Sequence, residues 1–278
     1  MARALVRPDM PMRIPTCCVL LALISAGAAH GAAPCTGSGV EVQVLGSGGP
    51  EMQDKCASSR LFTHLHIDHT ADFPALIKSS YFGERARALP VYGPGGNSEF
   101  PATTTFVADL FDRARGAYRY LGEFLRGAED GYVLQAHDAN LNSDEIRTVL
   151  KQKGMVISAT PVTHGSVPAL AWRIEVDGRT IVFSGDTNGE NESLRRLAHG
   201  ADVFVAHNAV PEGVTGPARA LHMPPSVIGE IAKSAGVRGL VLSHRMLRTL
   251  GREAETRAVI AQYYAGSLSF ADDLDCFH

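Results

Sequence analysis

The run His64–His69, which reads His-Leu-His-Ile-Asp-His, restricts the fold of this 278-residue chain more than any other feature. His64 and His66 lie two positions apart, so on an extended segment both imidazoles project to the same side and can share one metal ion. Asp68 and His69 follow at once and can turn towards a second ion. Imidazole nitrogens together with a carboxylate oxygen are ligands that zinc favours. Because the run follows a short apolar strand-like segment, we predict a metal site rather than a chance exposed cluster of histidines.

Three more candidate ligands are His164, Asp186 and His244, each of which comes directly after an apolar run typical of a buried strand. A single histidine in such a place is more often a structural residue than a ligand. Three such positions in one chain indicate instead that their side chains lie close together, because loops at one edge of a layered α/β fold face a common cleft. We therefore expect these side chains to meet the His64–His69 run.

Strand-like and helix-like segments alternate along the rest of the chain, without internal repeats, which favours one layered α/β domain. Asp177-Gly178 between two alternating apolar runs predicts a tight hairpin. The strands are expected over 40–45, 89–92, 155–162, 169–176, 179–183, 203–206 and 240–242, and the helices over 70–80, 103–124, 224–235 and 252–264.

The N-terminal segment has the pattern of an export signal. Three arginines precede an apolar run over 17–29, and small residues follow it. This run is shorter than the roughly 20 residues that cross a bilayer as a helix. We predict a signal peptide over 1–33 with cleavage near 31–33, a domain over 34–278, no membrane span, and a secreted or periplasmic location. The alternative is a buried N-terminal helix.

Cleavage would leave three cysteines, Cys35, Cys56 and Cys276. Export permits disulfides, and the two ends of a domain often lie close together. We therefore predict a bond between Cys35 and Cys276, with three free thiols as the alternative.

Five motifs together resemble those of the metallo-β-lactamase-fold hydrolase superfamily, and they occur in that family's order. They are Gly46–Pro50 (GSGGP), Thr63–His69 (THLHIDH), Thr163–Gly165 (THG), Ser184–Thr187 (SGDT) and Leu242–His244 (LSH). The resemblance implies an α/β fold, a four-layer αββα sandwich, with two zinc ions bound at one edge. Manganese or iron(II) could replace zinc.

The resemblance also implies which residues bind each ion. One ion would be held by His64, His66 and His164. The other would be held by Asp68, His69 and His244. Asp186 would bridge the two ions, and a hydroxide shared between them would be the nucleophile.

Two residues argue against branches of the family to which this chain could belong. Asp186 stands where true β-lactamases commonly lack an aspartate, and His66 stands where flavodiiron proteins carry a glutamate. The remaining branch includes tRNA 3′-processing nucleases, phosphodiesterases and arylsulfatase-like enzymes, and Leu221–Pro225 (LHMPP) resembles its motif whose histidine faces the scissile ester. We expect His222 to donate a proton to the leaving oxygen and count it with Asp68 as catalytic. The alternative for His222 is a capping or packing role at a helix start.

Two departures from the family pattern affect the expected function. Asn208 follows His207, where tRNA-processing nucleases have a glutamate that orients the proton donor, and the sequence has no separate basic, Gly/Pro-rich arm. With a formal net charge of −3, these features argue against nucleic acid as a partner. Only thirteen residues, 51–63, separate Pro50 from His64, where the family has several tens. We interpret this spacing as an internal deletion that leaves the first sheet incomplete.

The sequence therefore predicts an exported dinuclear-zinc hydrolase that cleaves a phosphoester or sulfate ester of a small molecule through a metal-bridging hydroxide. A catalytically inactive metal-binding homologue, disabled by the short segment, is one alternative. A ribonuclease Z-like endonuclease is another, and lactam hydrolysis is a third. The sequence leaves a homodimer open.

Overall fold

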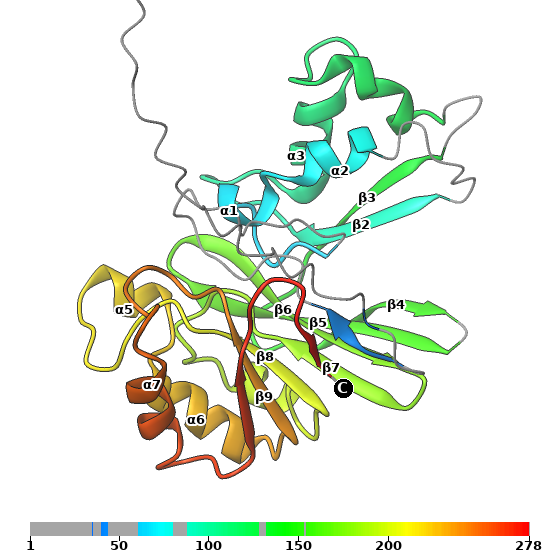
Figure 1. Cartoon of the computed structure of the whole chain (residues 1–278). Helices are drawn as coiled ribbons and strands as arrows, with labels where there is room; N and C mark the ends of the chain where they lie inside the picture. The colour runs from blue at the N-terminus through cyan, green and yellow to red at the C-terminus, as the bar shows by residue number, and fades with distance from the viewer. Residues whose placement is uncertain are drawn as a thin grey trace, which may run out of the picture. The chain divides into compact units, whose positions relative to one another are not determined.

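A seven-stranded sheet formed by the second half of the chain is the largest element of the fold (Figure 1). The structure, a computed structural model, describes residues 35, 40–43, 61–79, 88–127, 132–152 and 154–277. The strands of the sheet are β4 (Arg147–Gln152), β5 (Met155–His164), β6 (Val167–Val176), β7 (Arg179–Phe183), β8 (Val203–His207), β9 (Gly239–Ser243) and β10 (Ser267–Phe270). They lie side by side in the order β10-β9-β8-β7-β6-β5-β4. Neighbours from β4 to β7 are antiparallel, and neighbours from β7 to β10 are parallel.

The predicted strands β5 to β9 are confirmed, and so is the hairpin between β6 and β7. Asp177 and Gly178 have φ values of 48° and 77°, the positive values that a two-residue hairpin with the twist of its strands requires. Strands β4 and β10 at the two edges were not predicted.

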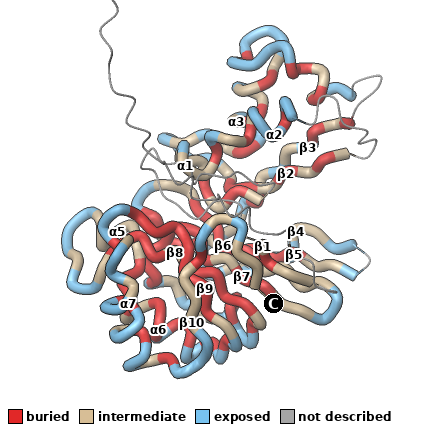
Figure 2. Tube along the Cα trace, viewed as in Figure 1, coloured by how far each residue is buried: buried red, intermediate tan, exposed pale blue. Residues whose placement is uncertain are grey.

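Three helices pack on one face of this sheet: α4 (Glu192–Leu197), α6 (Pro225–Ser234) and α7 (Glu253–Ile260). In β8, Phe204 points into the core beneath these helices, whereas Val203 and Val205 belong to the core on the opposite face. A strand covered on both faces needs apolar residues throughout, which explains its continuous apolar sequence. Figure 2 shows β8 and β9 buried along almost their whole length.

The opposite face of the sheet is covered by two small sheets, one of β1 (Val42–Gln43) with β11 (Cys276–Phe277) and one of β2 (Leu89–Pro94) with β3 (Leu134–Ala139). Their residues share apolar cores with the large sheet. Outside β2 and β3 lie α2 (Phe73–Ser79), α3 (Thr103–Phe111) and the 3-10 helix η2 (Arg119–Leu125), which pack on these strands in a further core. The layers are therefore helix, sheet, sheet, helix, and the predicted αββα sandwich is confirmed.

Phe62 and Thr63, which precede the histidine run, are hydrogen-bonded to strands on both sides, although only thirteen residues separate Pro50 from His64. The indole Nε1 of Trp172 donates to the Phe62 carbonyl at 3.1 Å, and the Leu170 amide donates to the Thr63 carbonyl at 2.7 Å. On the other side, the Phe62 amide donates to the Tyr92 carbonyl at 2.8 Å. Among the described residues, the first sheet therefore consists of β2, β3 and one bridge from Leu61 to Tyr92. The motif Gly46–Pro50 and the segment up to residue 60 lie outside the described residues.

The predicted helix over 103–124 is wrong in its extent. Helix α3 ends at Phe111, where the Asp112 carboxylate accepts hydrogen bonds from the Ala114 and Arg115 amides and turns the chain. A separate 3-10 helix then returns Leu121 and Phe124 to the same core. The apolar spacing predicts a single helix because both pieces bury side chains in the same core. Similarly, the helix predicted over 70–80 begins only at Phe73.

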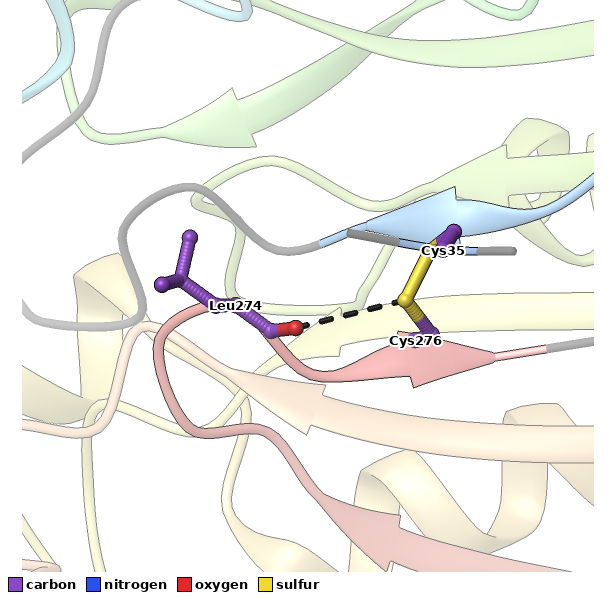
Figure 3. Close-up of a disulfide and its surroundings, with 3 residues drawn as sticks. All are labelled: Cys35, Leu274 and Cys276. Carbon is purple, nitrogen blue, oxygen red and sulfur yellow. Dashed lines mark hydrogen bonds between the residues drawn. A yellow bond between two sulfur atoms is a disulfide. The ribbon is translucent and has the colours of Figure 1, made fainter. Parts of the chain in front are cut away.

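Cys35 and Cys276 form a disulfide, as predicted, with Cα atoms 5.8 Å apart (Figure 3). The bond lies beside the antiparallel pair of β1 and β11, in which Gln43 is paired with Cys276. Cys56 and the predicted signal peptide over 1–33 lie outside the described residues. Within the described ranges, no helix is both long and apolar enough to cross a membrane.

Candidate metal centre

The first three predicted ligands meet at the end of the large sheet. His64 and His66 precede the short helix α1 (Ile67–Thr70), and His164 is the last residue of β5. The His66 Nδ1 atom lies 3.0 Å from His64 Nε2 and 3.4 Å from His164 Nε2. Their donor atoms all lie within 4.8 Å of one another, so one metal ion can bind all three imidazoles.

The ring of His164 is held by the start of another loop. Its Nδ1 donates to the Leu221 carbonyl at 3.0 Å, which leaves Nε2 to face the centre. Leu221 is the last residue of α5 (Pro217–Leu221) and touches the β5–β6 turn. Gly165 in that turn has a φ of 62°, and a Cβ there would lie 2.9 Å from Leu221 Cδ2. The positive φ favours glycine at this position, and any larger residue would also displace the Leu221 side chain.

A second group of donors comes from four parts of the chain. His69, Asp186, His207 and His244 each place one donor atom within 4.8 Å of the others. The Nε2 atoms of His69 and His244 lie 3.1 Å apart. Two ring nitrogens at this distance need a proton or a cation between them, because two lone pairs repel. The group is therefore suited to a second metal ion.

Asp186 is buried between the two groups, as expected of a bridging residue. Its Oδ2 lies 3.8 Å from His64 Nε2, 3.7 Å from His164 Nε2 and 3.6 Å from His69 Nε2. Gly185 fixes this position with a φ of 60°, where a Cβ would lie 2.8 Å from both the Leu170 carbonyl oxygen and Thr63 Cβ.

His207 was not predicted as a site residue, yet its Nδ1 donates to Asp186 Oδ1 at 2.7 Å. His207 ends β8 just as His164 ends β5. The pattern that predicts the other ligands, a histidine or aspartate at the end of an apolar strand, therefore applies to it as well. The predicted ligand Asp68 lies next to the second group, with its Oδ2 3.2 Å from His244 Nε2 and 3.4 Å from His69 Nε2.

His222 caps the C-terminal end of α5 and lines the cavity above the centre. Its Nδ1 lies 3.9 Å from Asp186 Oδ2 and is buried without a hydrogen-bond partner among the described residues. Burial lowers the pKa of His222 to about 4, although the Asp186 charge acts in the opposite direction. The ring is therefore neutral at pH 7 in the absence of a bound substrate, even with Asp186 beside it.

The electrostatics of the centre favour added positive charge. Burial alone would raise the pKa of Asp186, but His244, His69 and the hydrogen bond from His207 hold it well below its ordinary value. Burial would lower the pKa of His69, yet the Asp186 and Asp68 carboxylates raise it to about 9. Burial and the charge of His69 hold the pKa of His64 well below its usual range. Two carboxylates among crowded imidazoles, of which His69 attracts a proton when no metal is bound, form a donor set that fits divalent zinc.

His244 has an unusual backbone, with a φ of 53°, and the next residue holds it in place. The Arg245 guanidinium is buried and donates to the Glu253 carboxylate at 2.7 Å, the Asp272 carboxylate at 2.7 Å and the Ala271 carbonyl at 3.0 Å. Arg245 thus ties the end of β9 to the start of α7 and to the segment after β10.

The sequence profile of the β-lactamase superfamily domain matches residues 61–245, which contain every predicted ligand. The chain belongs to this superfamily of metallo-hydrolases. It is 30% identical to the ribonuclease Z of Mycolicibacterium paratuberculosis over 238 residues, covering 78% of each protein.

Two solved structures show the same metallo-β-lactamase fold. YhfI from Bacillus subtilis, described as a metallo-β-lactamase fold protein, has a TM-score of 0.61 at 19% identity, covering 85% of this chain and 98% of YhfI. The short form of human tRNase Z has a TM-score of 0.62 at 16% identity, covering 86% of this chain and 99% of that protein. At these identities the likeness concerns the fold alone.

Asn208 follows His207 and stands where tRNA-processing nucleases have the glutamate that orients the proton donor. It is buried, and its Nδ2 donates to the Val210 carbonyl at 3.3 Å. Its Oδ1 is buried and has no hydrogen-bond partner in the described part of the chain. The amide is thus turned to the backbone of its own loop, with no bond to His222.

Proposed function

We propose that this protein is an exported hydrolase that binds two zinc ions and cleaves a phosphoester or sulfate ester of a small molecule. The observation that carries the proposal is the convergence of two donor groups on one buried carboxylate, Asp186, whose Oδ2 lies 3.7 Å from His164 Nε2 in one group and 3.6 Å from His69 Nε2 in the other. Such a pair of sites is the arrangement used to hydrolyse esters with two metal ions.

His64, His66 and His164 would hold one ion, and His69, His244 and Asp68 would hold the other, with Asp186 between them. His207 supports Asp186 through its 2.7 Å hydrogen bond, or binds the second ion directly. The nitrogen-rich donor set favours zinc, and manganese or iron(II) are weaker candidates. When bound, the two ions supply a hydroxide at neutral pH and neutralise the charge that develops on the ester oxygens.

The protein's own residues would manage the protons. Asp68 stays ionised, because the hydrogen bonds from His244 and His69 outweigh burial and lower its pKa, so its free lone pairs can accept a hydrogen bond from the attacking group. His222 would donate a proton to the leaving oxygen. Its pKa of about 4 must rise for this role, and the negative charge of a bound ester near its unpaired Nδ1 has that effect.

The relatives named ribonuclease Z favour phosphoester over sulfate ester, and they make an endonuclease the second candidate function. The position of Asn208 favours a small ester instead, because this amide faces its own loop and cannot replace a carboxylate that orients His222. The anchoring of Phe62 and Thr63 on the large sheet argues against an inactive homologue, since the histidine run keeps its place despite the short segment before it.

Metal analysis and a substrate panel test the proposal together. Elemental mass spectrometry of the folded protein should find about two zinc ions per chain. The zinc-loaded enzyme should hydrolyse bis(4-nitrophenyl) phosphate or 4-nitrophenyl sulfate, and Asp186→Asn should abolish this activity. One ion or none in the folded protein, or two ions without ester hydrolysis, would contradict the proposal. Faster cleavage of a precursor tRNA than of any small ester would establish the endonuclease instead.

A further inference from the structure

A cavity of about 290 Å³ opens onto the candidate metal centre, and its lining combines polar and apolar side chains. The polar ones are five of the predicted ligands together with His222. The apolar ones are Ile67, Leu221 and Met246, which come from three separate parts of the chain. Within the described residues, the lining contains no lysine or arginine. We call Ile67, Leu221 and Met246 the apolar wall.

Ile67 is the least expected member of this wall. It stands between His66 and Asp68 at the start of α1, and 76% of its surface is exposed, more than that of any other large apolar side chain in the described structure. An isoleucine kept in water beside a concave site adds nothing to the core of the protein. An exposed apolar residue in such a position is available to contact a ligand.

The other two residues of the apolar wall are fixed by the contacts that fix the ligands. The Leu221 carbonyl accepts the hydrogen bond from His164 Nδ1 at 3.0 Å. Met246 is buried and follows Arg245, and its own carbonyl accepts from the Thr249 amide at 2.8 Å. The apolar wall is therefore already in place before a substrate binds, and Phe100, with its ring centroid 6.4 Å from that of His66, adds a further apolar group near the centre.

We propose that the substrate carries an apolar substituent, an aryl ring or a short alkyl chain, on the ester group beside its leaving group, and that this substituent binds on Ile67, Leu221 and Met246. The inference rests on the proposed ester hydrolysis and names its substrate class. The size of the cavity supports it, since an apolar cavity of about 150 Å³ already admits benzene. A cavity of about 290 Å³ thus has room for one such ring beside the ester group.

Two phosphonate esters with the same charge and the same leaving group test the inference. The zinc-loaded full chain is assayed with 4-nitrophenyl phenylphosphonate and 4-nitrophenyl methylphosphonate, and each kcat/KM is divided by the hydroxide rate of that ester. We expect the phenyl ester to be preferred about 10-fold or more, the discrimination that a hydrophobic pocket gives. Ile67→Ser should reduce this ratio at least fivefold, whereas Ile67→Leu should preserve it.

Ile146→Ser is the matched control, because Ile146 is also an exposed isoleucine, at 41%, and does not line the cavity. It should leave the ratio unchanged. Hydrolysis of both esters at equal rates, or an unchanged ratio in Ile67→Ser, would overturn this inference and leave the proposed function standing. A preference for esters with a second negative charge, lost in Arg248→Met, would also overturn it, because the charge of Arg248 reaches His222. No hydrolysis of these two esters, of bis(4-nitrophenyl) phosphate or of 4-nitrophenyl sulfate with two zinc ions bound would refute the proposed function itself.

Discussion

Replacing Cys35 and Cys276 together by serine should lower the free energy of unfolding without changing the metal centre. The bond closes a loop with a sequence separation of 241 residues, among the longest that this chain allows. The loss of loop-closure entropy for a loop of 241 residues gives about 5.5 kcal/mol at 25 °C. Residual structure in the unfolded chain reduces this value, so we expect a loss of about 2 to 5 kcal/mol.

The folded state should survive this change. The pairing of β1 with β11 and the apolar core around Val42 keep the two ends of the chain in place when the bond is absent. The hydrogen bonds that position the ligands lie within residues 61–272. We therefore expect metal content and kcat/KM at 25 °C to remain within about twofold of the parent protein.

Urea unfolding followed by circular dichroism measures the effect, with metal removed by chelator in every sample so that zinc binding does not contribute. Cys56→Ser is the control, because Cys56 has no part in this bond, and its urea midpoint should match that of the parent. Adding a reducing agent should shift the parent to the midpoint of the double variant and leave the double variant unchanged. A loss below 1 kcal/mol would refute the reasoning from chain entropy, and a loss of zinc would refute the independence of the centre.

Four further results are expected. Asp186→Asn should reduce the zinc content below one ion per chain, measured by elemental mass spectrometry, because its carboxylate is the only one within 4 Å of donors in both groups among the described residues. His207→Ala should weaken zinc binding about 10- to 100-fold in a chelator competition, the usual effect of losing a residue that orients a ligand; unchanged affinity would show that its bond to Asp186 is dispensable. The raised pKa of His69, about 9, keeps that ring protonated in the metal-free protein, so zinc binding should release its proton. Zinc affinity should therefore fall about tenfold for each pH unit below 9. Calorimetry in buffers of different ionisation enthalpy would detect the released proton. Arg245→Met should cost about 1 to 3 kcal/mol in urea unfolding and also lower zinc affinity, since Arg245 holds the backbone beside His244; an effect on stability alone would separate the two roles.

Much of the centre could be predicted because its residues share one local rule. His164, Asp186 and His244 each follow a buried strand, and parallel strands deliver their ends to one edge of a sheet. The same rule identifies His207, which ends β8 and is not among the predicted ligands. The sequence contains no direct sign of the 2.7 Å bond between His207 and Asp186, because it joins residues 21 positions apart through the turn at Gly185.

The parts of the fold that escaped prediction depend on tertiary contacts. Strand β10 has only four residues and is defined by its parallel pairing with β9. The break after Phe111 comes from a side-chain hydrogen bond of Asp112, which is invisible to apolar spacing. Likewise, the exposure of Ile67 could not be read from the histidine run, where an isoleucine among ligands looks like an ordinary core residue.

The distance along the chain between residues that meet in the centre has a consequence for how the protein acquires its metal. Asp68 and His244 lie 176 residues apart in sequence, so their contact requires the closure of a long loop. Such long-range contacts form late and slowly in folding. The unfolded chain therefore has no complete site, and metal ions would be bound only once the fold has formed. The compartment in which folding ends, as much as the set of donor atoms, would then decide which metal the centre takes.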